Sequence, residues 1–341
     1  MGNESSAIDT GPGGNPFEVT DGSVGNPFEY NPNENGKVVK FLTNENKANL
    51  NTEKIEEIQK QQESHYKVDD NTTTDQFYNF RNESTPDETI KLLDDLGTCL
   101  NGIDTKVAKK YCTHGINDKI LFIVCNTYTK PQYKLGVGPI NDALTVAIHH
   151  KKMGYNIVYL HNSTVVQFKK WLKFILMNTS SDLTIFYTGH GSQKRDTSGD
   201  EADGYDEVMV FDEGFVVDDE LANYLVKYAH GQRIVLLTDC CHSGSIWDIQ
   251  SILSRKENVS PNIISISASA DNETSKQTKF GTKDQGIFTY YFWQVFEQNN
   301  AITTTQMKAK IDPMIRRFGQ KLEYASTSDG IVNDPIFPHS K

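Results

Sequence analysis

The stretch RIVLLTDCCHSG, residues 233–244, joins a run of aliphatic residues to an acid, two cysteines, a histidine and a Ser-Gly turn. A short, continuous apolar run is typical of a strand buried on both faces of a parallel sheet. The reactive residues follow where this strand would end, and the sites of open α/β sheets lie beyond the carboxyl ends of their strands. The cluster has three open interpretations: a nucleophile, half of a metal site, or two buried thiols.

From about residue 117 onward, strand-like and helix-like segments alternate along the chain. The strand candidates are residues 119–127, 155–161, 182–191, 206–212, 232–241 and 262–270. The helix candidates are residues 141–154, 163–178, 217–231, 286–298 and 304–318. Strands that alternate with helices of this length indicate βαβ units. We therefore predict an α/β fold with a mainly parallel central β-sheet flanked by helices.

Residues 1–75 are rich in Asn, Gly, Glu, Ser, Gln and Lys and contain few aliphatic residues. Such a composition buries too little apolar surface to offset the entropy lost on ordering, so a largely disordered polar arm is expected. The folded domain is predicted over residues 76–341. It opens with a helical lead-in over 85–102, where Thr85 is the N-cap and Glu88 completes a capping box.

The N-terminal arm carries two candidate recognition signals. GNPFE occurs at Gly14–Glu18 and again at Gly25–Glu29. Asn-Pro-Phe forms a turn that exposes an aromatic ring. These tripeptides, Asn15–Phe17 and Asn26–Phe28, resemble the NPF ligands of EH domains and predict a partner of that type, the alternative being two turns without a partner. The N-terminal MGNESS fits the short pattern for N-myristoylation at Gly2, which would attach the protein only weakly to a membrane.

The bulk composition excludes several classes of function. The formal net charge is -11, which disfavours a general nucleic-acid binder and suits cationic partners or metal cations. The five cysteines are odd in number and form no C-x-x-C pair, so reduced thiols in the cytoplasm are expected. The sequence contains no apolar run near the roughly 20 residues that a membrane span requires.

Alternation along the strand separates the two adjacent cysteines. Asp239 and Cys241 share one face, while Cys240 lies on the other, where a free cysteine is usually a small buried hydrophobe. His190, between two glycines in YTGHGS, also follows a strand candidate and precedes Cys241 by about 50 residues, the spacing typical of caspases. A Cys/His dyad of this kind attacks peptide carbonyls, and the amides of Gly191 and Cys241 are the candidate oxyanion donors.

A zinc site is the competing interpretation of Cys240, Cys241, His242 and His190. Adjacent cysteines on opposite faces of a strand cannot easily bind one ion, and structural zinc draws on ligand pairs a few residues apart. The motifs YTGHG and DCCHSG, in this βαβ order, resemble those of the metacaspases, the caspase-like cysteine peptidases of protists, plants and fungi. The resemblance covers about residues 117–341. It implies a three-layer α/β/α caspase-like fold with Cys241 as nucleophile and His190 as its partner.

Within this family, the chain resembles the type I members. Its p20-like part would cover residues 117–250 and its p10-like part residues 260–341, without a long linker between them. Asp239 shares a face with Cys241, and a carboxylate there favours a P1 side chain of Arg or Lys. The resemblance adds Asp142 and Thr188 to the same S1 pocket, and a helix N-cap is the alternative role for Asp142. Because two acids raise a thiol pKa, we expect no strong preformed thiolate–imidazolium pair in the free enzyme.

Metacaspase-like segments also predict a calcium site. Carried over position by position from DGYDEV, VVDDEL and SIWD, the ligands would be Asp206, Asp218, Asp219 and Asp248. Carboxylate oxygens from three segments suit Ca²⁺, which accepts six to eight oxygens with loose geometry. The resemblance therefore implies activation by Ca²⁺ as the cofactor. An acidic, solvated loop is the alternative.

The leading hypothesis is a calcium-dependent cysteine endopeptidase that cleaves after Arg or Lys and processes itself. Lys and Arg in the loops 254–262 and 272–286 and in the arm are the candidate cleavage sites. The family resemblance implies a monomer, because the last strand candidates, KLEYAS and DGIVNDPIF, could block the sheet-edge pairing that caspases use. Two rivals remain: an Arg-directed peptidase of the same fold without calcium dependence, and a non-catalytic caspase-like scaffold or adaptor recruited through the NPF motifs.

Overall fold

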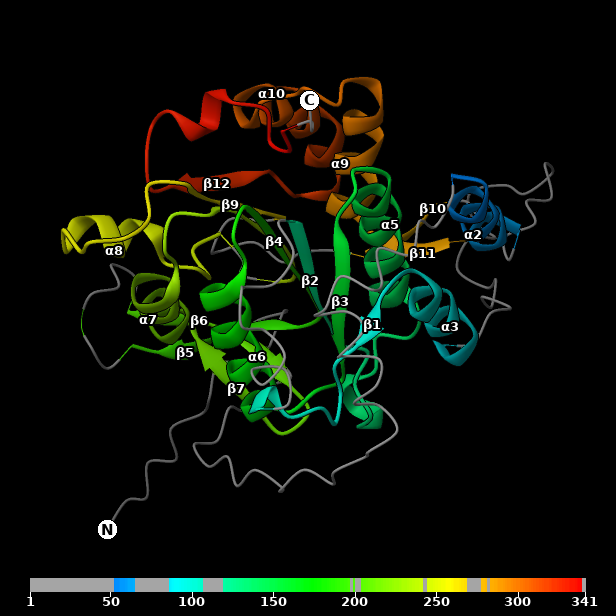
Figure 1. Ribbon diagram of the computed structural model, residues 1–341, viewed down its shortest axis with the longest axis horizontal. Helices are drawn as coiled ribbons and strands as arrows, with labels where there is room; N and C mark the ends of the chain where they lie inside the picture. The colour runs from blue at the N-terminus through cyan, green and yellow to red at the C-terminus, as the bar shows by residue number, and fades with distance from the viewer. Residues whose placement is uncertain are drawn as a thin grey trace, which may run out of the picture.

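The computed structural model describes residues 52–64, 86–106, 119–196, 199, 204–241, 244–268, 277–280 and 283–338. Its centre is a seven-stranded sheet in the order β1–β3–β2–β4–β8–β9–β12 (Figure 1). The first six strands are parallel, and β12 pairs antiparallel with β9 at one edge. The strands are β1 Thr98–Cys99, β2 Lys119–Cys125, β3 Asn156–His161, β4 Asp182–Thr188, β8 Arg233–Asp239, β9 Ile263–Ser267 and β12 Glu323–Ser326.

Helices cover both faces of this sheet. One apolar cluster joins one face to α2 Thr52–Ser64, α3 Pro86–Leu96, α5 Gly138–Lys152, α9 Ile287–Gln298 and α10 Thr304–Ile315. A second cluster joins the other face to α6 Val165–Asn178, α7 Asp218–Tyr228 and α8 Ile249–Ser254. The described residues also include the short 3-10 helices η2 Pro131–Tyr133, η3 Arg316–Phe318 and η4 Ile331–Asn333. The predicted mainly parallel α/β/α sandwich is confirmed.

The order of the strands reverses direction at β2, which makes a topological switch point at the centre of the sheet. Strand β2 lies between β3 and β4, and α5 and α6, which connect these strands, pack on opposite faces. Ligand sites of open parallel sheets form at such a point, outside the carboxyl ends of the strands. The loops that follow β2, β4 and β8 therefore meet at one edge.

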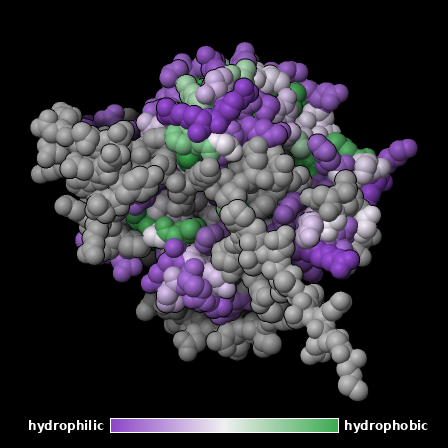
Figure 2. All heavy atoms as spheres, turned by 180° about the vertical axis from the view of Figure 1, so that it is seen from behind, coloured by the Kyte–Doolittle hydropathy of each residue, from purple (hydrophilic) through white to green (hydrophobic). Residues whose placement is uncertain are grey.

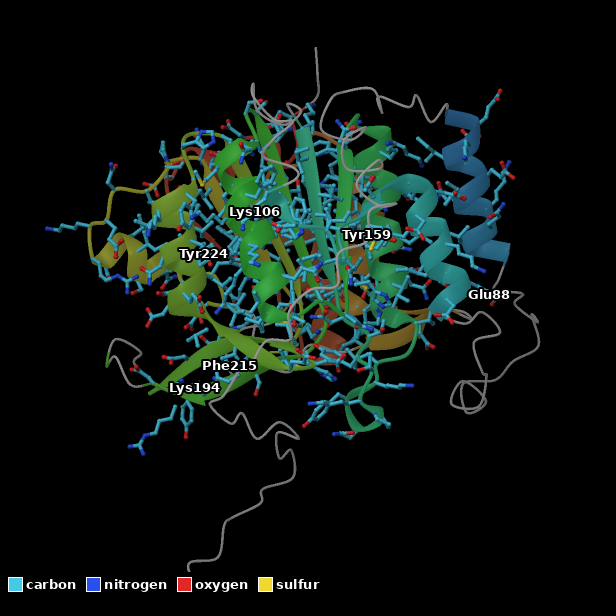
Figure 3. The ribbon with its side chains drawn as sticks, turned by 60° about the horizontal axis from the view of Figure 1, so that its bottom comes forward. Glu88, Lys106, Tyr159, Lys194, Phe215 and Tyr224 are labelled. Atoms are coloured by element: carbon cyan, nitrogen blue, oxygen red, sulfur yellow. The ribbon has the colours of Figure 1, made fainter. Side chains whose placement is uncertain are left out.

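Two smaller β-structures extend this edge. The antiparallel sheet of β5 Gly191–Arg195, β6 Tyr205–Phe211 and β7 Gly214–Val217 begins directly after the β4 turn. Figure 3 shows it below the central sheet, with Lys194 and Phe215 together on it; the Lys194 ammonium lies 5.5 Å from the centre of the Phe215 ring. A hairpin of β10 Gln277–Phe280 and β11 Lys283–Gly286 leads into α9. The strand predicted over 206–212 thus belongs to the small sheet.

The N-terminal segments differ from the prediction in two ways. Residues 52–64, within the predicted polar arm, form α2, and its Ile55 and Ile58 are buried against α5 and α3. For this part of the arm the prediction of disorder is wrong, because two apolar residues one turn apart pack on the core and Gln59 accepts a hydrogen bond from Lys152 of α5. The lead-in helix ends at Leu96, and Thr98–Cys99 then joins the sheet edge as β1. Gly2 and both NPF motifs lie outside the described residues.

The C-terminal segment also departs from the expectation. KLEYAS supplies β12, but Ile331–Asn333 is a 3-10 helix, so the second strand predicted from DGIVNDPIF does not form. Within the described residues, β12 is one edge strand of the central sheet and β1 is the other. Among the same residues, no helix is long and apolar enough to cross a membrane.

Candidate active site

His190 follows β4 and lies beside the loop after β2. Its Nε2 is 2.9 Å from the carbonyl oxygen of Tyr133. A carbonyl only accepts hydrogen bonds, so Nε2 carries the proton and Nδ1 is the basic nitrogen of the neutral ring. Burial lowers the pKa of His190 below its ordinary value, and the hydrogen bond to Tyr133 opposes part of that shift. The site thus holds a neutral imidazole in one tautomer.

Two buried tyrosines fix the backbone of His190. Its amide donates to the Tyr128 hydroxyl at 2.6 Å, and the Tyr187 hydroxyl donates to its carbonyl oxygen at 2.7 Å. The Tyr128 ring also packs against the imidazole, with centroids 4.7 Å apart. A Cβ on Gly189 would lie 2.8 Å from the Tyr128 hydroxyl, so the residue before His190 has no room for a side chain. None of these tyrosine contacts was predicted from the sequence.

The structure separates the two cysteines as the strand alternation predicts. Cys240 is buried in the apolar cluster beneath α6 and α7, whereas Cys241 is partly exposed. Burial, with smaller contributions from Cys241 and Asp239, raises the pKa of the Cys240 thiol well above its ordinary value. Cys240 is therefore a buried, protonated thiol, which leaves Cys241 as the accessible one of the pair. His242, part of the zinc alternative, lies outside the described residues.

The backbone after β8 touches the backbone after β4. A Cβ built on Gly191 would lie 1.8 Å from the carbonyl oxygen of Cys241 and 2.8 Å from the Cys240 sulfur. Strands β4 and β8 are paired, with Thr188 opposite Asp239. Parallel pairing thus brings His190–Gly191 and Cys240–Cys241 together at the carboxyl edge of the sheet. Gly191 is required there because any side chain would separate the two segments.

The three predicted S1 residues lie close together in the interior. Thr188 donates its hydroxyl to Asp142 at 3.4 Å, and the Gly286 amide donates to the other oxygen of Asp142 at 2.9 Å. Asp239 accepts from the amide and hydroxyl of Thr289, at 3.2 and 2.7 Å. Asp142 lies inside α5, which begins at Gly138, so the alternative role as N-cap is wrong.

The predicted calcium residues are only partly gathered. Asp218 accepts from the amides of Glu207 and Asp219 at 2.8 and 2.7 Å, and burial raises its pKa well above the ordinary carboxyl value. The Arg255 guanidinium lies 3.4 Å from Asp219 and 3.8 Å from Asp248. Burial also raises the pKa of Asp248, to about 6.

These carboxylates suit calcium chemically, because they are hard oxygen donors. In this arrangement, however, the described residues contain no group of three or more acidic, cysteine or histidine side chains that could hold a metal ion. Asp206 lies on β6, opposite Lys194 of β5. The residues therefore do not form a ligand cage as they stand, and Arg255 occupies the space between two of them.

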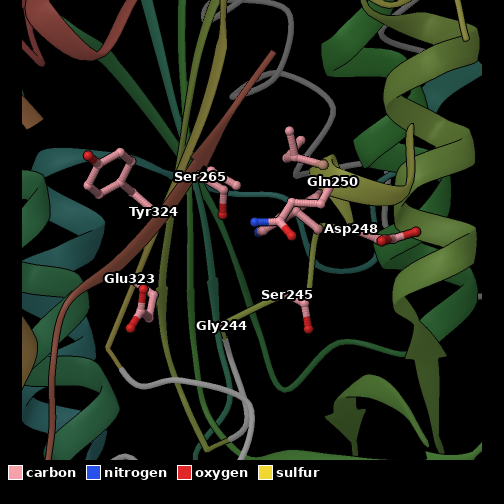
Figure 4. Close-up of a pocket in the computed structure, with 10 residues that line it drawn as sticks. Gly244, Ser245, Asp248, Gln250, Ser265, Glu323 and Tyr324 are labelled. Atoms are coloured by element: carbon pink, nitrogen blue, oxygen red, sulfur yellow. The ribbon is translucent and has the colours of Figure 1, made fainter. Parts of the chain in front are cut away.

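A cavity of about 150 Å³ lies beside the loop that follows the candidate nucleophile (Figure 4). Gly244, Ser245, Asp248 and Gln250 line it from that loop and the start of α8, and Ser265, Glu323 and Tyr324 line it from β9 and β12. The loop thus has open volume behind it.

Comparison with known proteins decides the family. The sequence pattern described as the caspase domain, of the peptidase C14 group, matches residues 118–330. The chain belongs to the caspase domain family. His190, Cys241 and the predicted S1 acids all lie within the matched caspase domain, whereas α2, α3 and β1 precede it.

Metacaspases are among the relatives of this caspase domain. Metacaspase-1 of Arabidopsis thaliana is 33% identical over 152 residues, which is 37% of this chain and 41% of that protein. Metacaspase-1A of Neurospora crassa is 44% identical over 79 residues, 22% of this chain and 17% of that protein. The chain thus spans less than half the length of these relatives. The resemblance to metacaspases is confirmed.

Solved structures of similar fold include caspase-1 from Spodoptera frugiperda, with a TM-score of 0.48 and 11% identity, over 63% of this chain and 91% of that one. Protein GSU0716 from Geobacter sulfurreducens gives a TM-score of 0.49 and 21% identity, over 65% of this chain and all of that one.

Proposed function

We propose that this caspase-domain protein is a cysteine endopeptidase in which Cys241 is the nucleophile and His190 the proton carrier. The proposal rests on the close contact between the backbones of Gly191 and Cys241. This contact places the end of the strand that carries the histidine beside the end of the strand that carries the cysteine. The Tyr133 carbonyl on Nε2 supports this assignment, because it leaves Nδ1 as the base.

The steps follow ordinary acyl-transfer chemistry. The Cys241 thiol gives its proton to Nδ1 of His190 as sulfur attacks the scissile carbonyl carbon, and the carbonyl oxygen becomes an oxyanion. Backbone amides of Gly191 and Cys241 stabilise that oxyanion. The imidazolium then protonates the departing amine, which leaves an acyl-enzyme. Water, deprotonated by the neutral imidazole, attacks the thioester and releases the acid and the thiol.

We propose a preference for Arg or Lys at P1. Asp142 and Asp239 are buried on the side of the sheet that carries α5 and α9, and Asp239 is two residues before the nucleophile. Two carboxylates near the scissile bond attract a cationic side chain and disfavour an acidic one. A bound cation would also offset the acids and ease ionisation of Cys241.

Calcium dependence is a further proposal about this enzyme. Arg255 already bridges Asp219 and Asp248, so Ca²⁺ would have to replace the guanidinium as the cation that joins α7 to α8. Asp248 begins the helix after the nucleophile loop and has a left-handed backbone conformation. Binding there would alter the loop that carries Cys241, which is how we expect activation to occur.

Self-processing follows from the proposed specificity. An enzyme that cleaves after basic residues would find targets in exposed loops, and Arg255 and Lys256 lie at the end of α8. Mass spectrometry of purified wild type and Cys241→Ala protein after incubation with Ca²⁺ tests this. New termini that follow Lys or Arg in the wild type alone are expected, whereas identical fragments in both proteins would exclude self-cleavage.

The main test of function uses paired fluorogenic peptides that end in Arg or Asp before the reporter. We expect cleavage of the Arg peptide only, and its loss in Cys241→Ala but not in Cys240→Ala. Preferred cleavage of the Asp peptide would overturn the S1 assignment. Absence of any cleavage by folded protein, with Ca²⁺ or without it, would favour the non-catalytic scaffold.

A further inference from the structure

We propose that Gly286 and Thr289, at the junction of β11 and α9, position both S1 carboxylates and so determine the preference between Arg and Lys. This inference rests on the proposed function, because it concerns the pocket that binds the P1 side chain. Gly286 and Thr289 both donate hydrogen bonds to these carboxylates. They are therefore positioning residues, whose effect should fall on substrate binding.

The first contact holds Asp142. The Gly286 amide donates to one carboxylate oxygen at 2.9 Å, and Thr188 donates to the other at 3.4 Å. Strand β11 is itself fixed on α5, because Asn141 donates its side-chain amide to the Asp284 carbonyl at 2.8 Å and Gln285 donates to Thr145 at 3.1 Å. The position of the Gly286 amide is thus set by two anchors on the helix that carries Asp142.

The second contact holds Asp239. One of its oxygens accepts both the amide and the hydroxyl of Thr289. Gly286 is the N-cap of α9, so the Thr289 amide is one of the first-turn donors that lack a partner within the helix. A carboxylate is favoured there by the helix dipole as well as by the hydrogen bonds. Asp239 thus completes the start of α9, and α9 in turn fixes the rotamer of Asp239.

Gly286 also limits where the Asp239 carboxylate can lie. A Cβ at position 286 would come within 2.0 Å of one Asp239 oxygen and 2.7 Å of its carboxyl carbon. Any side chain at this position would push the acid away. Gly286 therefore contacts both acids, one through its amide and the other through its bare α-carbon, and it sets the distance between them.

That distance matters more for Arg than for Lys. A guanidinium is a rigid, planar fork that pairs with carboxylates in a defined geometry, whereas an ammonium is a compact point charge with rotatable donors. Movement of one carboxylate should weaken binding of an Arg side chain strongly and that of a Lys side chain less. The ratio of the two specificities therefore reports the positioning by residues 286–289.

The test compares Thr289→Val, Thr289→Ser and Gly286→Ala with wild type, using matched peptides with Arg or Lys at P1 and saturating Ca²⁺. Valine keeps the shape of threonine without its hydroxyl, and serine restores the hydroxyl. We expect Thr289→Val and Gly286→Ala to raise KM for the Arg peptide about tenfold with kcat nearly unchanged, and to lower the Arg-to-Lys ratio. Thr289→Ser should lie near wild type.

Two controls separate positioning from misfolding. The rate of Cys241 alkylation by iodoacetamide and the far-UV circular dichroism spectrum should match wild type in all three variants. Unchanged KM and Arg-to-Lys ratio in Thr289→Val, or a Thr289→Ser variant as impaired as Thr289→Val, would overturn the inference while leaving the proposed function intact. Failure of the wild type to cleave after Arg would instead overturn the proposed function, and this inference with it.

Discussion

At the scale of single residues, the site is organised by contacts between segments far apart in the chain. Alternation along β8 predicted that Cys241 and Asp239 share a face and that Cys240 is buried, because these facts depend on strand geometry alone. Tyr128 and Thr289 escaped prediction, because their hydrogen bonds to His190 and Asp239 span 62 and 50 residues. No local pattern marks such partners.

Tyr128, which the sequence did not mark, has an unusual backbone conformation. Its φ of 63° lies in the left-handed region, which a bulky residue rarely adopts, and Asn162 holds its amide at 2.9 Å. In this conformation the hydroxyl accepts the hydrogen bond of the His190 amide. The same loop carries the Tyr133 carbonyl that selects the tautomer.

We expect Tyr128→Phe to lower kcat about tenfold, equivalent to about 1.4 kcal/mol of barrier, with little change in KM. Removal of the hydroxyl leaves the His190 amide without its acceptor and loosens the imidazole, but it does not touch the S1 acids. Steady-state kinetics with the Arg peptide measure the split.

The matched control is Tyr155→Phe, another buried tyrosine, which lies just before β3 at the opposite end of the sheet. It should leave both constants unchanged. Equal losses of kcat in the two variants would show that Tyr128 has no special role.

At the scale of elements, the alternation predicted most helices and strands of the domain but not their assignment to sheets. Periodicity identified residues 206–212 as a strand, yet only tertiary pairing places β6 in the small sheet. β1 is two residues long, too short for any pattern to reveal. Helix α2 was missed because polar residues dominate its composition, while Ile55 and Ile58 pack on the core and Gln59 accepts a hydrogen bond from Lys152 of α5.

The packing of α5 on β4 encloses a histidine. His150 is fully buried; its Nδ1 donates to the Val146 carbonyl, and its Nε2 lies 3.0 Å from the Thr184 hydroxyl. Burial lowers the pKa of His150 from 6.5 to about 3. Between pH 6.5 and about 3, the His150 imidazole is therefore protonated in the unfolded chain and neutral in the folded protein.

The contribution of His150 to the free energy of unfolding should therefore have its full value above pH 6.5. It should fall by about 1.4 kcal/mol per pH unit as the pH drops from 6.5 toward 3. Urea unfolding at several pH values measures the slope. His150→Leu should be less stable at pH 7 but show a shallower dependence on pH. Identical slopes in both proteins would contradict the account.

The junction of α7 and α8 tests the calcium proposal. If Arg255 competes with Ca²⁺ for Asp219 and Asp248, Arg255→Gln should bind Ca²⁺ several-fold more tightly, because the competing charge is gone. Isothermal titration of the purified protein measures this without reference to activity. Lys227→Gln, a basic residue in the last turn of α7, is the control for loss of one positive charge. Weaker or unchanged binding in Arg255→Gln would argue against the exchange.

At the scale of the whole molecule, a caspase domain is combined with helices that precede it in the chain. Tyr159 donates to Asp94 of α3, and α2 packs in turn on α3 and α5, so these segments extend the core of the domain (Figure 3). The visible described surface is mostly hydrophilic, with small, separate hydrophobic patches (Figure 2).

The central claim is that Cys241, beside an acidic S1 pocket, is the nucleophile. The most direct measurement is to incubate the full-length protein with a peptide that ends in arginine chloromethyl ketone and to locate the adduct by mass spectrometry. The account predicts one adduct, on Cys241, that is absent from His190→Ala and is not formed by the matching peptide that ends in aspartate. An adduct on Cys240, or equal labelling by the aspartate peptide, would contradict it.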